Sequence, residues 1–348
     1  MRNIIKKDFS NELIGREGDF LEIKDFSIFE VKGLIHPPKK LISYPRYIVD
    51  DKGERQKGIR RYRKIYPLKE RHELLKQKYS NLLVNDPFLN MEIPEVSQSD
   101  IVTHYRPDEI LEKIRKKKIP DNEEMKALEL SNHLKDHSDI TASAIGISGS
   151  IMIGLQTASS DIDLIIYGRN ESNKTRNTLK NLLSEEKQVR KLRNNEMLRL
   201  YKFRGADEIM QFDVFVKHEL RKSFQGFFGD REFFIRYLPN WAEIDEKYGS
   251  IKYVPTGYVK IKARIKDASE AFLSPCRYLL EQIEILDGNK VLNIIEVVSF
   301  RGRFCEQAES GESVIIQGKL EEVLTSEGNH YRVLLGGNPS DFMISLSL

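Results

Sequence analysis

Two hydrophobic runs, joined by a glycine–serine turn and followed by a pair of aspartates, constrain this chain more than any other feature of its sequence. Ala144–Ser148 predicts a buried strand, Gly149 and Ser150 predict a tight turn, and a short helix is expected from Ile151. Glycine at such a turn lets a phosphate approach backbone N–H groups closely, and the helix N-terminus favours negative charge. Because its hydroxyl can add a donor, Ser150 is a predicted phosphate-binding residue together with Gly149.

The pair of aspartates, Asp161 and Asp163, opens the next predicted strand. Alternation along a strand puts both carboxylates on one face and turns Ile162, Leu164 and Ile166 to the other. Two adjacent carboxylates repel each other and lose solvation unless a cation compensates them. Hard oxygen ligands of this kind suit Mg²⁺ or Mn²⁺, which also bridges triphosphate oxygens.

A third acid, Asp213, lies within residues 208–217, which alternate in the manner of a strand. Phe212, Val214 and Val216 share the opposite face of this predicted strand. An acid in so apolar a strand calls for a partner. If the strand lies beside that of the other two aspartates, the three carboxylates form a two-metal site. One ion would lower the pKa of an attacking hydroxyl, and the other would orient a triphosphate and stabilise the leaving pyrophosphate.

The order Gly-Ser, ten residues, Asp-x-Asp and a later aspartate resembles the DNA polymerase β-like nucleotidyltransferase superfamily. The matched motifs cover roughly residues 144–217. The resemblance implies transfer of a nucleotidyl group from an NTP, with phosphate held by Gly149 and Ser150. It also implies that Asp161 and Asp163 bind both metals, and that Asp213 completes the nucleophile-side metal site. Ile151 and Met152 stand where many small relatives carry a basic residue, so Lys or Arg of segment 187–204 is expected to meet the phosphate charge.

The remaining chain predicts an α+β protein in which this core, a mixed sheet with helices, is flanked by β-rich modules. We expect an N-terminal β-rich region with a basic helical segment at 1–107, a catalytic domain at 108–250, and a small β-barrel or sandwich at 251–348. The flanking regions are similar to those of longer archaeal proteins that are predicted nucleotidyltransferases. Residues 84–107 are expected to be an irregular connection, 197–203 a strand, and 224–241 a helix.

Basic segments suggest an extended substrate. Residues 55–78 contain ten Lys or Arg and two Glu, although the net charge of the chain is only +3. This segment either tracks a phosphate backbone, with Tyr62 and Tyr66 available for stacking, or is simply a solvated basic face. Arg301-Gly-Arg303 either contacts RNA at the edge of the C-terminal barrel or belongs to a packing module.

The leading hypothesis is therefore a Mg²⁺- or Mn²⁺-dependent nucleotidyltransferase that uses an NTP and acts on RNA. A protein or small-molecule hydroxyl is the competing acceptor, and a non-catalytic nucleic-acid-binding protein with the same fold is the alternative from another class. No apolar run reaches the roughly 20 residues needed to cross a bilayer. No signal peptide is evident either, so a cytoplasmic protein without membrane association is expected.

Overall fold

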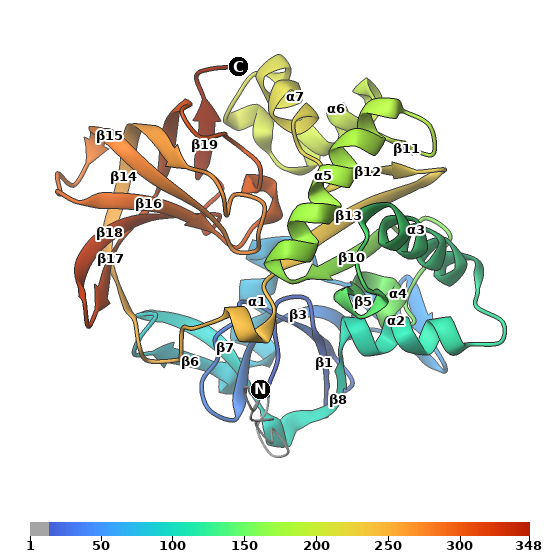
Figure 1. The fold of residues 1–348 in the computed structure, drawn as a ribbon. Helices are drawn as coiled ribbons and strands as arrows, with labels where there is room; N and C mark the ends of the chain where they lie inside the picture. Colours follow the sequence, from blue (N-terminus) through green and yellow to red (C-terminus); the bar gives the residue numbers. More distant parts are fainter. Residues whose placement is uncertain (1–13) are drawn as a thin grey trace, which may run out of the picture.

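A computed structural model describes residues 14–348, so the first thirteen residues of the expected N-terminal domain lie outside the described residues. The described chain is a mixed α/β protein with three sheets, one built from each third of the sequence (Figure 1). In Figure 1 the N-terminal sheet is blue to turquoise, the central sheet with its helices is turquoise to yellow, and the C-terminal sheet is orange to red. No helix among the described residues is long and apolar enough to cross a membrane.

The N-terminal sheet has eight strands, of which the long strand β3 (Lys40–Val49) pairs with β2, β5 and β7. The predicted irregular connection at 84–107 is wrong, since most of it forms strands despite its prolines. Helix α1 (Leu68–Lys78) confirms the predicted basic helix and is followed by a short turn, η1 (Ser80–Leu82). The other elements of this module are β1 (Phe20–Ile23), β2 (Ile28–Val31), β4 (Arg55–Lys57), β5 (Arg60–Lys64), β6 (Leu83–Asp86), β7 (Met91–Ser97), η2 (Gln98–Asp100) and β8 (Ile101–Tyr105).

The central sheet has the strand order β11-β12-β13-β10-β9, in which β10 and β13 are parallel and the other neighbours antiparallel. Its strands are β9 (Ile145–Ile147), β10 (Ile162–Tyr167), β11 (Val189–Arg190), β12 (Gln225–Phe228) and β13 (Arg231–Leu238). Its helices are α2 (Pro107–Lys116), α3 (Asn122–Ser138), α4 (Gly149–Met152), α5 (Arg169–Glu185), α6 (Asn194–Phe203) and α7 (Phe212–Leu220). Short 3₁₀ turns complete it: η3 (Ala142–Ala144), η4 (Ala206–Glu208) and η5 (Trp241–Glu243).

Three predicted elements of this region are wrong. Residues 197–203 and 212–217, expected as strands, lie in helices α6 and α7. Residues 224–241, expected as a helix, form strands β12 and β13 around Gly229 and Asp230. The buried residues of α7 explain its form, because Phe215, His218 and Glu219 have the three- and four-residue spacing of one helix face.

The two faces of β10 have different neighbours. Ile162, Leu164 and Ile166 are buried in the main core, which also contains Leu130 of α3 and Leu179 of α5. The opposite face looks toward the N-terminal module, since a side chain on Gly18 would overlap Ile165 and the Arg16 guanidinium lies 3.4 Å from the centre of the Tyr167 ring. The face that carries the two aspartates is therefore the face toward the N-terminal module.

The C-terminal strands form a closed barrel. The order β14-β15-β16-β18-β17 closes because β14 also pairs with β17, so the β-rich C-terminal region is a barrel and not a sandwich. With a single parallel pair, β16 with β18, this is the connectivity of an OB-fold barrel. Its elements are β14 (Lys252–Asp267), β15 (Cys276–Gly288), β16 (Ile294–Ser299), η6 (Gly302–Phe304), β17 (Ser313–Thr325), β18 (Gly328–Leu335) and β19 (Phe342–Ser345).

Candidate active site

The two aspartates lie at the start of β10, on its face toward the N-terminal module. Asp163 is directly opposite Phe234 of the parallel strand β13, and its backbone carbonyl accepts a hydrogen bond of 2.9 Å from the Ser148 N–H. No Lys, Arg or His nitrogen of residues 14–348 lies within 4.0 Å of either carboxylate. The strand thus presents two adjacent acids that have no direct ion pair.

Gly149 is in contact with the second of these acids. Its backbone has φ +65°, and a Cβ built at this position would overlap the Oδ2 and Cγ atoms of Asp163. Both the left-handed backbone and the close approach therefore require glycine here. The predicted change from strand to short helix is confirmed, but helix α4 begins at Gly149 and not at Ile151. The missing side chain leaves the space that the Asp163 carboxylate occupies.

Ser150 lies beneath the surface of the same turn. Its side chain is buried, and its hydroxyl donates a 3.1 Å hydrogen bond to Ser160 Oγ, which also accepts from the Thr157 N–H at 2.9 Å. Ser150 thus ties the turn to the loop that leads into Asp161. The phosphate-binding role of Gly149 and Ser150 stays a prediction.

Cations from the N-terminal module and β13 act on these acids from further away. Burial, followed by the charge of Asp161, raises the pKa of Asp163 to about 7, while Lys64, Arg46 and Arg236 oppose that rise. Burial lowers the pKa of Lys64, with Arg46 adding to the effect. The basic groups nearest to the acids thus include residues of β3 and β5, where the sequence pointed to segment 187–204.

The expected third acid is not part of this cluster. Asp213 is exposed in the first turn of α7, because residues 212–217 form a helix and not the predicted strand. Among residues 14–348 no three His, Cys, Asp or Glu side chains lie close enough together to hold a metal ion. The predicted strand that would have carried Asp213 to the other aspartates therefore does not exist.

Glu232 is the acid that the β13 register brings beside Asp161. Phe233 pairs with Ile162 in the parallel ladder, so the preceding residue of β13 comes next to the residue that precedes β10. Burial raises the pKa of Glu232, and the negative charge of Asp161 adds to that rise. Its carboxylate is 2.6 Å from a guanidinium nitrogen of Arg199 in α6. No sequence signal pointed to this acid, because residues 224–241 were expected to form a helix.

Most basic residues of segment 55–78 are held by the protein itself. The Arg55 guanidinium donates to the Leu155 carbonyl at 2.6 Å and thereby fastens the loop before Asp161. Arg63 pairs with Asp50 and Glu70, and Lys78 pairs with Asp25 at 2.9 Å. The segment is therefore not one free basic face, although it contributes Lys64 to the surroundings of the aspartates.

Helix α6 meets the N-terminal module beside this cluster. The rings of Tyr66 and Phe203 lie 4.9 Å apart, centre to centre, and both side chains are exposed. Tyr66 also lies 4.8 Å from the Arg46 guanidinium and 5.6 Å from Lys64 Nζ. The aspartates therefore have the N-terminal module on one side and α6 on another.

Comparison with known proteins gives two matches. A family model described as nucleotidyltransferase domain matches residues 127–200, which include both aspartates and the Gly149-Ser150 turn. An uncharacterised protein of Methanocaldococcus jannaschii is 30% identical over 328 residues, which cover 92% of this chain and 94% of that protein. No solved structure matches the chain.

Proposed function

Because this chain belongs to the DNA polymerase β-like nucleotidyltransferase superfamily, we propose that it transfers a nucleotidyl group from an NTP to an acceptor hydroxyl and releases pyrophosphate. The observation that carries the proposal is the pair Asp161 and Asp163, which has no ion pair and lies against the Gly149 turn. Two such carboxylates repel each other unless a cation compensates their charge.

A divalent cation fits these residues. The raised pKa of Asp163 reflects desolvation and the repulsion of Asp161, and both effects favour a bound cation. Carboxylate oxygens are the ligands that Mg²⁺ and Mn²⁺ prefer. Asp161 and Asp163 would hold the metal, and Glu232 would join them after leaving Arg199. When bound, the metal would neutralise the carboxylates, polarise the transferred phosphoryl group and lower the pKa of the attacking hydroxyl.

The residues of the chain itself position the nucleotide. The backbone of the Gly149 turn offers N–H groups to phosphate oxygens at the side of β10 that faces β9. Lys64 and Arg46 add positive charge beside the aspartates, where the triphosphate would carry its negative charge. Arg55 and the Ser150–Ser160 hydrogen bond fix the loop between the turn and Asp161.

RNA is the acceptor that we propose. Lys69 and Lys76 are exposed on α1, and no carboxylate of the described residues lies within 4.0 Å of either amino group. Such unpaired cations suit a phosphate backbone. A protein or small-molecule hydroxyl is the competing acceptor. Non-catalytic nucleic-acid binding is the alternative in which the carboxylates would be dispensable.

The test compares wild type with Asp161→Asn/Asp163→Asn in the presence of Mg²⁺ or Mn²⁺ and each labelled NTP. Total RNA is the acceptor in one arm, and the protein itself is the acceptor in the other. Label transferred by wild type alone supports the proposal and identifies the acceptor class. If wild type transfers no label and binds no NTP, the proposed activity is wrong.

A further inference from the structure

The barrel sends one loop to the catalytic face. Residues Arg301, Gly302 and Arg303 follow β16 and enter the short turn η6. A Cβ built on Gly302 would lie 2.6 Å from Cζ of Phe234, which is the residue opposite Asp163 in the β10–β13 ladder. Two arginines of the C-terminal barrel thus flank a glycine that packs beside the catalytic strand pair.

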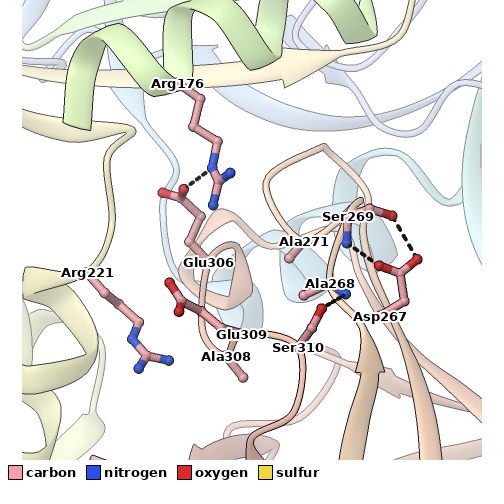
Figure 2. A pocket seen from close by; sticks show the side chains of 10 residues that line it. All are labelled: Arg176, Arg221, Asp267, Ala268, Ser269, Ala271, Glu306, Ala308, Glu309 and Ser310. Atoms are coloured by element: carbon pink, nitrogen blue, oxygen red, sulfur yellow. Dashed lines mark hydrogen bonds and ion pairs between the residues drawn. The ribbon is translucent and has the colours of Figure 1, made fainter. Parts of the chain in front are cut away.

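This loop is held in place from the catalytic side. Lys222 Nζ donates to the Arg303 carbonyl at 2.7 Å, and the Ser223 N–H donates to Glu306 at 2.6 Å. Arg176 of α5 also pairs with Glu306 at the edge of a cavity of about 280 Å³ (Figure 2). Of the other lining residues, Arg221 pairs with Glu312 at 2.8 Å and Asp267 accepts from the Ser269 N–H at 2.9 Å. The cavity lies between the catalytic domain and the barrel, and the contacts of Glu306 at its edge hold the segment that follows the two arginines in place.

The arginines of the loop have no acidic partner in contact. No carboxylate of residues 14–348 lies within 4.0 Å of a guanidinium nitrogen of Arg301, Arg303 or the buried Arg71 of α1. The Nε–H of Arg303 is buried and has no hydrogen-bond acceptor. Burial and the neighbouring charges of Arg301 and Arg204 lower the pKa of Arg303 to about 10, against a smaller opposing effect of Asp341.

Arg71 joins this group to the catalytic cluster. Burial lowers the pKa of Arg71, the charge of Glu30 opposes that shift, and the charges of Arg46 and Arg301 add to it, so the surroundings of Arg71 include both the barrel loop and a cation of the catalytic cluster. Grouping guanidiniums of like charge in half-buried or buried positions, with no carboxylate in contact, costs free energy unless an anion compensates them. Such a group of arginines suits a ligand that carries several negatively charged oxygens.

We propose that Arg301 and Arg303, supported by Arg71, bind a phosphate group of the acceptor and thereby place its hydroxyl at the aspartates. Guanidinium groups match phosphate oxygens in charge and in bidentate geometry. The acceptor is therefore a molecule with a phosphate ester close to its reacting hydroxyl, which describes both a polynucleotide strand and a nucleoside monophosphate.

The sheet order assigns this site to the acceptor and not to the NTP. Strand β10 lies between β9, whose end leads into the Gly149 turn, and β13, which carries Phe234. In the function proposed above, on which this step rests, the triphosphate occupies the Gly149 side. The barrel loop approaches from the β13 side, which is also the side of Glu232.

The experiment measures binding to the full-length protein in the absence of turnover. Fluorescently labelled oligouridylate of ten nucleotides and labelled AMP are titrated in EDTA over a range of salt concentrations, and ATP is titrated separately with Mg²⁺. For Arg301→Gln/Arg303→Gln we expect at least about a 10-fold loss of affinity for one of the two phosphate probes. For the oligonucleotide, the slope of log affinity against log salt should fall by about 0.7 for each phosphate that the variant no longer neutralises. The affinity for Mg²⁺-ATP should stay unchanged.

Lys290→Gln is the matched control, because it removes an exposed charge from the β15–β16 connection, at the other end of β16 from the arginine loop. Arg303→Lys should recover part of the affinity. Loss of oligonucleotide binding indicates a polynucleotide acceptor, and loss confined to AMP indicates a small phosphorylated one. The proposal is overturned if wild type binds neither probe, if both affinities survive the double substitution, or if Mg²⁺-ATP binding falls as much. A failure of the proposed function can be distinguished from a failure of the arginine site. In that case wild type would bind the probes but would show no nucleotidyl transfer.

Discussion

At the scale of single residues, the site is built on the contact between Gly149 and Asp163. Their roles could be proposed from the sequence because the turn, the ten-residue spacing and the aspartate pair lie within one continuous segment. Glu232 could not be found in this way. Its place beside Asp161 depends on the register between β10 and β13, and these strands are far apart in the sequence, with several helices and a hairpin between them.

Gly149→Ala should reduce nucleotidyl transfer by at least about 100-fold. A methyl group at this position displaces the Asp163 carboxylate and also strains a backbone at φ +65°. Gly154→Ala is the control, because Gly154 has φ +69° but has no atom within 4 Å of a built Cβ. Comparing the nucleotidyl transfer rates of the two folded variants separates displacement of the Asp163 carboxylate from backbone strain. Equal losses would mean that backbone strain, and not the contact with Asp163, accounts for the defect.

Glu232→Gln should lower kcat by about 100-fold, since a ligand to a catalytic metal contributes several kcal/mol to the transition state. Asp213→Asn, in the exposed first turn of α7, should change kcat by less than about twofold, in line with a surface substitution. Steady-state kinetics at saturating NTP and Mg²⁺ compare the two variants. The opposite ranking would return the third-ligand role to Asp213.

At the scale of elements, the sequence predicts best where one local signal decides the structure. The strand before Gly149 and the basic helical segment in the N-terminal module are examples that the structure confirms. Residues 212–217 alternate in polarity, but α6 and the strand β12 present an apolar surface that a helix covers with Phe215. Residues 84–107 form strands although they contain prolines, since Pro94 lies in β7 opposite Leu83 of β6. Both errors come from contacts between elements, which the pattern within one segment does not show.

Asp121→Ala should loosen the first turn of α3. The Asp121 carboxylate accepts from the Glu124 N–H at 2.9 Å, and Glu124 accepts in return from the Asp121 N–H at 2.9 Å. Loss of such a cap costs about 1 kcal/mol. Amide hydrogen exchange in this turn should therefore accelerate several-fold, whereas Asp121→Asn, which keeps an acceptor, should change it less. An exchange rate unaltered by the alanine would show that the cap does not limit local opening.

At the scale of the whole molecule, the proposed active site involves all three sheets. The central sheet carries the acids, the N-terminal module provides Lys64 and Arg46, and the barrel places Gly302, between Arg301 and Arg303, against Phe234 of β13. The sequence indicated three regions and marked the two arginines, but it could not show that they meet. Helix α7 is one of the joints: buried His218 donates through Nδ1 to the Gln307 carbonyl at 3.1 Å and accepts through Nε2 from the Ser345 N–H at 3.4 Å.

This histidine should make the joint sensitive to acid. Burial, with the charges of Lys222 and Arg221, lowers the pKa of His218 to about 4 in the folded protein, from an ordinary value of 6.5. Because the pKa is lower in the folded than in the unfolded protein, the neutral His218 contributes fully to folding stability above about pH 6.5. This contribution is lost as the pH falls toward 4. At pH 5 the free energy of unfolding is lower by about 2 kcal/mol for this reason.

The apparent melting temperature of wild type should therefore fall more between pH 7 and pH 5 than that of His218→Gln, which keeps a donor and an acceptor but does not titrate. Melting curves at the two pH values, with both proteins in the same buffers, measure the difference. Equal decreases for the two proteins would contradict a role for His218 in acid sensitivity.

Asp163 is influenced by Lys64 of β5 and by Arg236 of β13, which has a consequence for the order in which a newly synthesised chain becomes competent for nucleotidyl transfer. The N-terminal strands leave the ribosome before β10 does. Strand β13 follows much later, because helices α5, α6 and α7 and strands β11 and β12 lie between it and β10 in the chain. Domains generally fold as units in the order of synthesis, at about 5–20 residues per second. A nascent chain thus carries both aspartates and their N-terminal cations for several seconds before Glu232 arrives, and longer still before Arg301 and Arg303. In the proposed function, translation itself would therefore delay the chemistry until the barrel is in place.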